Sequence, residues 1–162
     1  MPREEFGKGH NFLPKNEILT YEEISNFVRA CKPLGLRKVR ITGGEPLLRQ
    51  DIHHLVRQLS SMEMEVALTT NGSLLEKNAV YLAESGLSRV TISLDAIDQD
   101  VHSSITDSQV PVTDILDGIS AAVRYEMGPV KVNCVVQRGV NEDQIPKLVR
   151  KFRGTGVIVR FI

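Results

Sequence analysis

The sequence predicts an α/β fold of parallel strands, arranged as a wide or incomplete barrel rather than an open sheet. Strand-like and helix-like segments follow one another five times, at intervals of about 30 residues, as in parallel βα repeats. Strands of an open parallel sheet are covered on both faces and are therefore apolar on both sides, whereas each strand here keeps one polar row. A closed eight-stranded barrel fills its lumen with branched apolar residues. The polar rows therefore favour a barrel whose inner face is a ligand cavity.

The composition is that of an ordinary globular domain. The chain has 162 residues, of which 41% are hydrophobic, and this predicts a single domain. The formal net charge is zero, so no overall field attracts nucleic acid or an anionic membrane. No apolar run approaches the roughly 20 residues of a membrane span, and the first residues do not resemble a signal peptide. We expect a cytoplasmic protein with no nucleic-acid or membrane partner.

The first expected elements are a loop and a capped helix. Residues 1–19 show no sustained periodicity and are expected to form a loop. Thr20 and Glu23 form a capping box, in which each side chain binds the other residue's backbone amide at the start of a helix. The apolar stripe of this helix is expected to face the core and consists of Ile24, Phe27, Val28 and Cys31.

A strand over residues 37–42 then leads into a glycine-rich loop. Its Val and Ile side chains point to one side, and two cations and a hydroxyl point to the other, which should be interior. The following Gly43-Gly44 lets a ligand approach the main chain closely, and Glu45 adds an acceptor beside the exposed amides. The alternative is a plain strand-to-helix turn.

The remaining elements repeat this alternation. A second helix is expected after Asp51 as its cap. Further strands are expected over residues 63–70, 89–95, 130–136 and 157–162, with helical stripes over 79–83, 115–123 and 145–152 and a polar stretch before Pro111.

Two groups of polar residues could suggest a metal site, and we favour a simpler reading of both. His53 and His54 are adjacent on a helix, off its apolar stripe, and are expected to be solvated. Asp95, Asp98 and Asp100 match no calcium consensus, so helix capping is favoured over a metal loop.

The polar rows of the five strands contain several cations. Lys38, Arg40, Lys131 and Arg160 in one lumen predict an anionic ligand, while an internal salt-bridge network of these cations with Glu65 and Asp95 is the alternative. The complete row consists of Lys38, Arg40, Thr42, Glu65, Thr69, Asn71, Thr91, Ser93, Asp95, Lys131, Asn133 and Arg160.

The stretch Thr42-Gly43-Gly44-Glu45-Pro46 resembles the GGEP motif of radical S-adenosylmethionine enzymes. Further stretches resemble one family among them, the GTP 3',8-cyclases of molybdenum cofactor biosynthesis. In order, they are Phe12-Leu13-Pro14-Lys15, Lys38 to Leu47, Thr69-Thr70-Asn71-Gly72, Ser93-Leu94-Asp95, Val130-Lys131-Val132-Asn133 and Arg160-Phe161-Ile162. Together they extend over essentially the whole chain.

The resemblance implies a partial (βα)6 TIM-like barrel of the radical S-adenosylmethionine type. The chain would be a single core fragment, 1–162, that lacks the first strand and consists of the loop 1–19 and five βα units over 20–162. The implied cofactors are S-adenosylmethionine and [4Fe-4S] clusters. The implied reaction is that of a lyase, which converts GTP to 3',8-cyclo-7,8-dihydro-GTP. The resemblance also allows a homodimer and contact with the next enzyme of the molybdopterin pathway.

The resemblance also assigns site residues, with no catalytic residue among them. Those implied to bind S-adenosylmethionine are Gly43, Gly44 and Glu45 at its methionyl end and Ser93 at its ribose. Those implied to bind GTP are Arg40, Thr69 and Lys131, with Lys38 as a further triphosphate contact.

The cluster cysteines of that family have no counterpart in this sequence. The family's first cluster is held by a C-x-x-x-C-x-x-C motif that is typically followed by Met-Pro, the dipeptide with which this chain begins. Only Cys31 and Cys134 are present; both fall on apolar stripes and are expected to be buried, protonated and unreactive. We therefore expect a chain truncated at both ends, with no metal ligands, that alone neither assembles a cluster nor cleaves S-adenosylmethionine.

Two other interpretations stay open at this point. One is a non-catalytic fragment that retains nucleotide contacts. The other is a different radical S-adenosylmethionine enzyme, such as a peptide-modifying one, although the lumen cations argue against a peptide substrate.

Overall fold

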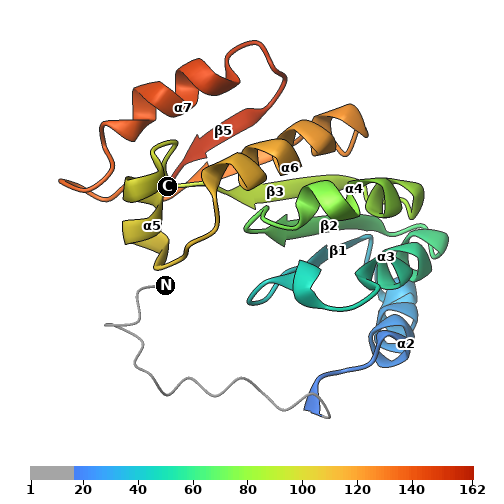
Figure 1. The fold of residues 1–162 in the computed structure, drawn as a ribbon. Coiled ribbons are helices and arrows are strands. Elements are labelled where there is room, and N and C mark those ends of the chain that lie inside the picture. Colours follow the sequence, from blue (N-terminus) through green and yellow to red (C-terminus); the bar gives the residue numbers. More distant parts are fainter. Residues whose placement is uncertain (1–16) are drawn as a thin grey trace.

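Five parallel strands form one sheet whose order is that of the sequence. The computed structural model describes residues 17–162, and its strands are β1 (Lys38–Ile41), β2 (Glu65–Thr70), β3 (Arg89–Ser93), β4 (Lys131–Cys134) and β5 (Ile158–Phe161) (Figure 1). Because the order never reverses, right-handed crossovers place the connecting helices on one face of the sheet. This is the wall of a barrel and not a doubly wound sheet, which confirms the predicted fold class.

The helices alternate with the strands as predicted, with one addition. They are α2 (Tyr21–Cys31), α3 (Ile52–Ser61), α4 (Leu75–Glu84), α5 (Gln99–Thr106), α6 (Val112–Arg124) and α7 (Gln144–Phe152), and the short 3-10 turns are η2 (Lys32–Leu34) and η3 (Pro46–Leu48). The sequence predicted only a polar stretch where α5 lies. Most of the expected loop over 1–19, with its stretch Phe12-Leu13-Pro14-Lys15, lies outside the described residues. None of the helices in the described part of the chain is long and apolar enough to cross a bilayer.

The start of α2 confirms the predicted capping box, but its buried face differs from the prediction. The Thr20 hydroxyl accepts from the Glu23 amide at 3.1 Å, and the Glu23 carboxylate accepts from the Thr20 amide at 2.7 Å. These bonds lower the pKa of Glu23. Phe27 is 69% exposed, and Cys31 is only half-buried. The predicted stripe is wrong at both positions because α2 packs mainly on α3 and buries only a narrow face there.

The predicted cap of α3 has the expected position without the expected bond. Asp51 is the N-cap residue, but its backbone is left-handed (φ 53°) and its side chain makes no capping hydrogen bond. The helix is instead held by its apolar face, because Ile52, Leu55, Val56 and Leu59 are all buried.

The core lies between the sheet and the helices. The helix-facing rows of the central strands contain Val66, Leu68, Ile92 and Val132, all fully buried. Strand β5 lies at one edge of the sheet and is the least covered of the five, since each of its residues is exposed or half-buried. The apolar rows therefore face the helices and leave the predicted polar rows on the opposite face of the sheet.

Helices α4 and α6 approach each other closely at Gly118. A Cβ atom added at Gly118 would lie 2.7 Å from the Gly72 carbonyl oxygen and 2.9 Å from the Leu75 Cβ. Both distances are too short for real contacts, and neither neighbouring atom belongs to the far end of a flexible side chain. Glycine at this position therefore sets the spacing between the two helices.

We expect Gly118→Ala to destabilise the protein by about 1–3 kcal/mol, because the added methyl group overpacks this contact. In an open helical position the same change would stabilise by about 0.5–1 kcal/mol, so the sign of the effect is diagnostic. Urea denaturation measures it. Ser120→Ala, at an exposed position of the same helix, should stay within about 0.5 kcal/mol of the parent. A Gly118→Ala variant as stable as the parent would contradict the close approach.

Candidate functional site

The register of the strands brings the predicted polar residues together on the face turned away from the helices, here called the inner face. Thr69 lies opposite Thr91, and Thr91 lies opposite Lys131. One step toward the carboxyl ends of the strands, a second row across the sheet consists of Ser93, Asn133 and Arg160. Residues from four strands therefore share one surface.

Arg40 is positioned by hydroxyl groups rather than by a carboxylate. Its guanidinium donates to Thr69 Oγ1 at 3.0 Å and to Thr91 Oγ1 at 3.4 Å. Thr69 and Arg40 were both predicted as site residues, and the structure places them in contact. Neutral hydroxyls leave the positive charge uncompensated, so Arg40 can still bind an anion.

Lys38 is engaged differently from the other inner-face cations. Its ammonium forms an ion pair with Glu65 at 2.8 Å, and Arg89 pairs with the same carboxylate at 2.7 Å. The hydrogen bond from Lys38 is the main cause of the lowered pKa of Glu65, with Arg89 and Arg40 adding to it. The salt-bridge alternative thus describes Lys38. Arg89 was not predicted as an inner-face residue, although it lies two residues before Thr91 on the same strand and therefore on the same face.

Three cations of the inner face have no such partner. Within residues 17–162, neither Arg40, Lys131 nor Arg160 forms an ion pair with a carboxylate. Asp95, the other expected neutraliser, instead accepts a hydrogen bond from the Val135 amide at 2.8 Å. The inner face therefore carries a local excess of positive charge in a chain of zero net charge.

The glycine-rich loop after β1 is held by Glu45. The Glu45 carboxylate accepts from the Leu47 amide at 2.9 Å, from the Thr70 hydroxyl at 2.7 Å and from the Asn71 amide at 2.7 Å. Gly43 has φ 147°, and a Cβ atom there would meet nothing within 4 Å. The main chain at Gly43 and the exposed Gly44 is thus open to a ligand, while the Glu45 side chain is already occupied by protein donors.

A polar cavity of about 220 Å³ lies at the carboxyl ends of β2 and β3. Ser93, predicted as a site residue, lines it together with Asn71 and Asp95. The opposite wall comes from α5, the loop after it and the first turns of α6, and consists of His102, Thr106, Ser108, Val110 and Ile115. Figure 1 shows α5 beyond the carboxyl ends of the strands. His102 was missed because no motif marks α5 in the sequence.

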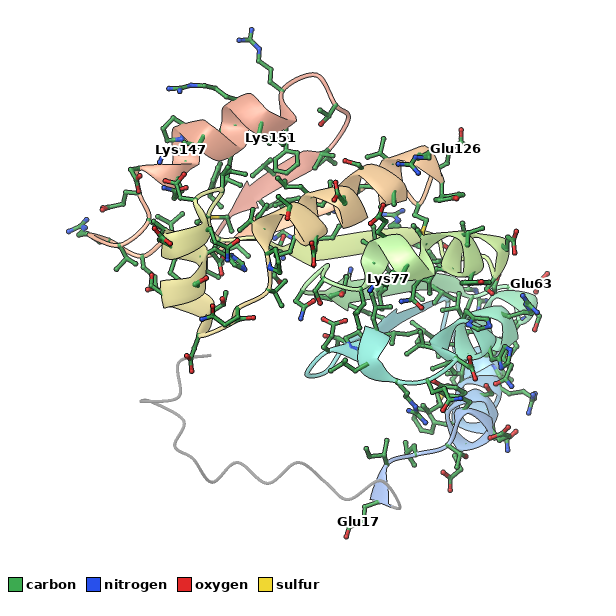
Figure 2. The ribbon with its side chains drawn as sticks, viewed as in Figure 1. Glu17, Glu63, Lys77, Glu126, Lys147 and Lys151 are labelled. Carbon is green, nitrogen blue, oxygen red and sulfur yellow. The ribbon has the colours of Figure 1, made fainter. Side chains whose placement is uncertain are left out.

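The start of α5 is held by α7. Gln144 is buried; its amide oxygen accepts from the Ile97 and Asp98 amides at 3.1 and 3.2 Å, and its nitrogen donates to the Asp98 carboxylate at 2.8 Å. Lys147, labelled on α7 in Figure 2, also pairs with Asp98. This contact lowers the pKa of the Asp98 carboxyl. Asp98 is the N-cap residue of α5, as the capping prediction expected, but its side chain makes no capping hydrogen bond.

The described residues do not fit an iron–sulfur cluster. No three of their His, Cys, Asp or Glu side chains gather in a metal-binding arrangement. Cys134 is buried, as predicted, and burial raises the pKa of its thiol to about 11. Cys31 lies at the far end of α2, outside the inner face. The described residues instead offer an open main chain at Gly43 and Gly44 and a cavity at the carboxyl ends of the strands, with cations that lack carboxylate partners on the inner face.

The family of the chain follows from comparison with known proteins. Residues 5–152 match the model of the radical SAM superfamily. The chain belongs to the radical SAM superfamily. Its match to solved structures agrees with the fold: Streptococcus suis SuiB bound to S-adenosylmethionine superposes with a TM-score of 0.69 at 25% identity, over 94% of this chain and 34% of that one. A radical SAM methyltransferase from Sphaerobacter thermophilus gives 0.65 at 27% identity, over 88% and 47%.

Curated relatives with higher identity carry a more specific name. A GTP 3',8-cyclase of Acidothermus cellulolyticus is 45% identical over 100% of this chain and 45% of its own length. One from Staphylococcus saprophyticus is 46% identical over 100% of this chain and 48% of its own length. This radical SAM chain therefore spans about half the length of the curated relatives it matches.

We expect Glu45→Gln to destabilise this radical SAM chain by about 1.5–3 kcal/mol, because hydrogen bonds to a charged acceptor are lost and an amide NH2 group is turned toward backbone donors. Denaturation with urea and hydrogen exchange at the Leu47 and Asn71 amides measure the effect. Glu84→Gln is the matched control, since Glu84 is exposed on α4 and makes no ion pair among residues 17–162. Unchanged exchange at both amides in Glu45→Gln would contradict this role of the carboxylate.

The two cysteines should differ in reactivity. A thiol reagent near neutral pH is expected to modify half-buried Cys31 and to leave buried Cys134 unmodified until denaturant is added, because the thiolate is the reactive form. Mass spectrometry of peptides after limited labelling identifies the modified residue. Labelling of Cys134 in the folded protein at the rate of Cys31 would show that the described burial is wrong.

Proposed function

We propose that this chain is the part of a GTP 3',8-cyclase that holds its substrate and S-adenosylmethionine. Such an enzyme converts GTP to 3',8-cyclo-7,8-dihydro-GTP, an early step of molybdenum cofactor biosynthesis. The observation that carries the proposal is the set of inner-face cations that form no ion pair with a carboxylate among residues 17–162, namely Arg40, Lys131 and Arg160. A triphosphate would neutralise this surplus of positive charge, and the names of the curated relatives support GTP as the molecule that carries it.

The inner-face geometry supports the proposed substrate contacts. Lys131 and Arg160 lie on the neighbouring strands β4 and β5. The Arg40 guanidinium contacts Thr69 and Thr91, and Thr91 is the residue opposite Lys131, so cations from three strands share the inner face. Lys38 is a weaker candidate than its sequence position suggested, because Glu65 already compensates its charge. We therefore propose Arg40, Thr69 and Lys131 as GTP-binding residues, with Lys38 as a further triphosphate contact that contributes less to binding.

S-adenosylmethionine is proposed to bind along the carboxyl edge of the sheet. The open main chain at Gly43 and Gly44 would hold its methionyl end, and the exposed Ser93 hydroxyl would face its ribose. Glu45 would contribute by fixing the loop rather than by touching the ligand, since its oxygens already accept three hydrogen bonds. When bound, S-adenosylmethionine supplies the radical chemistry of this superfamily. We assign no cluster ligand to residues 17–162.

The work of these side chains is to bind and orient. Fixed cations hold the triphosphate without reorganisation, and hydroxyl groups keep the Arg40 guanidinium in place before substrate arrives. A peptide substrate, as in the precursor peptide complex of SuiB, fits this charge less well, and the SuiB structures are at most 25% identical to this chain. A cytoplasmic location, a homodimer and an encounter with the next enzyme of the pathway belong to the same proposal.

Titration calorimetry with GTP and guanosine tests the substrate assignment. The chain should bind GTP more tightly than guanosine, and Arg40→Ala or Lys131→Met should weaken GTP binding by about 1–3 kcal/mol, because a charge-assisted contact is lost. Lys38→Met should have a smaller effect, since its ammonium is already paired with Glu65.

Arg124→Ala is the matched control, because Arg124 is exposed at the end of α6 on the helical layer. It should bind GTP as the parent does. Equal affinities for GTP and guanosine, or a loss in Arg124→Ala as large as that in Lys131→Met, would rule out the proposed triphosphate site.

A further inference from the structure

Two buried side-chain atoms among the described residues lack a hydrogen-bond partner, His102 Nδ1 and Asn133 Oδ1. An unpaired buried polar atom destabilises a protein, so each such atom in a native fold calls for an explanation. Asn133 lies opposite Ser93 in the sheet, and His102 lines a cavity together with Ser93. Both unpaired atoms therefore lie around the same serine.

His102 is held in its place by the rest of the fold. Its side chain is 96% buried, since only 4% is exposed, and its amide bonds to the Asp98 carbonyl at 2.9 Å in the first turn of α5. Gln144 and Lys147 of α7 hold the start of this helix through the Asp98 carboxylate. The imidazole is thus not a mobile surface group that could find a partner by rotating into solvent.

The cavity beside His102 has unused hydrogen-bonding capacity. The Asn71 oxygen already accepts from the Ser73 amide and hydroxyl, at 2.9 and 2.8 Å, which leaves the Asn71 amide nitrogen available. Asp95 uses one oxygen for the Val135 amide, which leaves the other. With the Ser93 hydroxyl, the cavity presents donors and acceptors together, a combination suited to a polyhydroxylated ligand.

The charge state of the imidazole agrees with such a ligand. Burial lowers the pKa of His102, and the Asp95 carboxylate opposes this shift only in part. A neutral imidazole has one donor and one acceptor nitrogen, and a hydroxyl group, which can both donate and accept, satisfies Nδ1 in either tautomer. The cavity volume of about 220 Å³ equals the liquid volume of about seven waters, so a sugar ring has room in it.

We propose that His102 is a ligand-binding residue whose Nδ1 forms a hydrogen bond with a ribose hydroxyl of the adenosyl group of S-adenosylmethionine. The ribose would lie in the cavity between Ser93 and α5, with Asn71 and Asp95 available to its second hydroxyl. The inference rests on the proposed function, which supplies the nucleoside, and adds the residue that recognises its sugar.

The test uses this chain with 15N-labelled histidine and two probes, adenosine and 2',3'-dideoxyadenosine, which lacks the 2' and 3' hydroxyls that the ribose of S-adenosylmethionine also carries. The imidazole 15N resonances of His102 should shift on addition of adenosine and move much less with the dideoxy analogue. His53 and His54 on α3 serve as internal controls and should not respond. A response of His102 that is the same for both nucleosides, or absent while adenosine binds, would overturn the proposal and assign Nδ1 to a bound water.

Variants give a second, independent measurement. The parent should bind adenosine roughly three- to tenfold more tightly than the dideoxy analogue, and His102→Phe should remove most of this difference. His102→Gln retains an amide that can donate and accept, so it should recover part of the preference, while His54→Gln should behave as the parent does. Loss of affinity for both nucleosides by the same factor in His102→Phe would indicate a purely structural role and contradict the proposal.

The outcome is separable from that of the proposed function. Binding of GTP that depends on Lys131, combined with no hydroxyl-dependent response at His102, would leave the cyclase proposal standing and remove this one. A hydroxyl-dependent response at His102 without preference for GTP over guanosine would support the role of His102 and rule out the proposed triphosphate site. If His102→Phe does not fold, as judged by circular dichroism, the imidazole 15N resonances of His102 in the parent protein test the proposal without the variant.

Discussion

The Glu45 carboxylate joins the ends of β1 and β2, and the arrangement of the ligand-facing edge depends on it. One side chain accepts hydrogen bonds from the Leu47 amide of its own loop and from Thr70 and Asn71 at the end of the next strand. Hydrogen bonds to an ionised acceptor are stronger than those between neutral groups. The η3 segment after β1 and the start of the loop after β2 are therefore held as one unit, and Gly43 keeps its open backbone beside that unit.

A second constraint is the one-sided polarity of the strands. The helix-facing rows, such as Leu68 and Ile92, are fully buried and hold the sheet against the helices, while the other rows are free to carry charge. Hydroxyls of Thr69 and Thr91 orient Arg40 without cancelling its charge. Like charges on one surface repel each other, so an anion bound at the inner face would stabilise the chain. Stability and ligand binding are thus linked through the same row of residues.

The sequence was informative where a feature depends on near neighbours. The capping box of Thr20 and Glu23, three residues apart, and the two-residue period of the strands were predictable because both are local patterns. The exposure of Phe27 was not, because it depends on which helix packs beside α2. For the same reason no pattern announced the contact of Asp98 with Lys147, which are 49 residues apart, and the catalytic family became visible only through motif resemblance.

The candidate site shows the same division. The inner-face row, including Arg40 and Lys131, was predictable from strand parity, whereas the pairing of Lys38 with Glu65 required the register of β1 against β2. His102 could not be found from its neighbours in the chain, because its importance arises from a cavity built by three separate segments.

The contact at Gly118 has a consequence for how ligand preference can change. Its helix, α6, presses on the Gly72 peptide, which directly follows the cavity residue Asn71. Helix α6 therefore supports the loop after β2 from the helical layer, on the side away from the inner face. A substitution at Gly118 can change the shape of the cavity without touching a ligand. The exposed positions around Arg124 lie outside this contact and can carry labels or fusions.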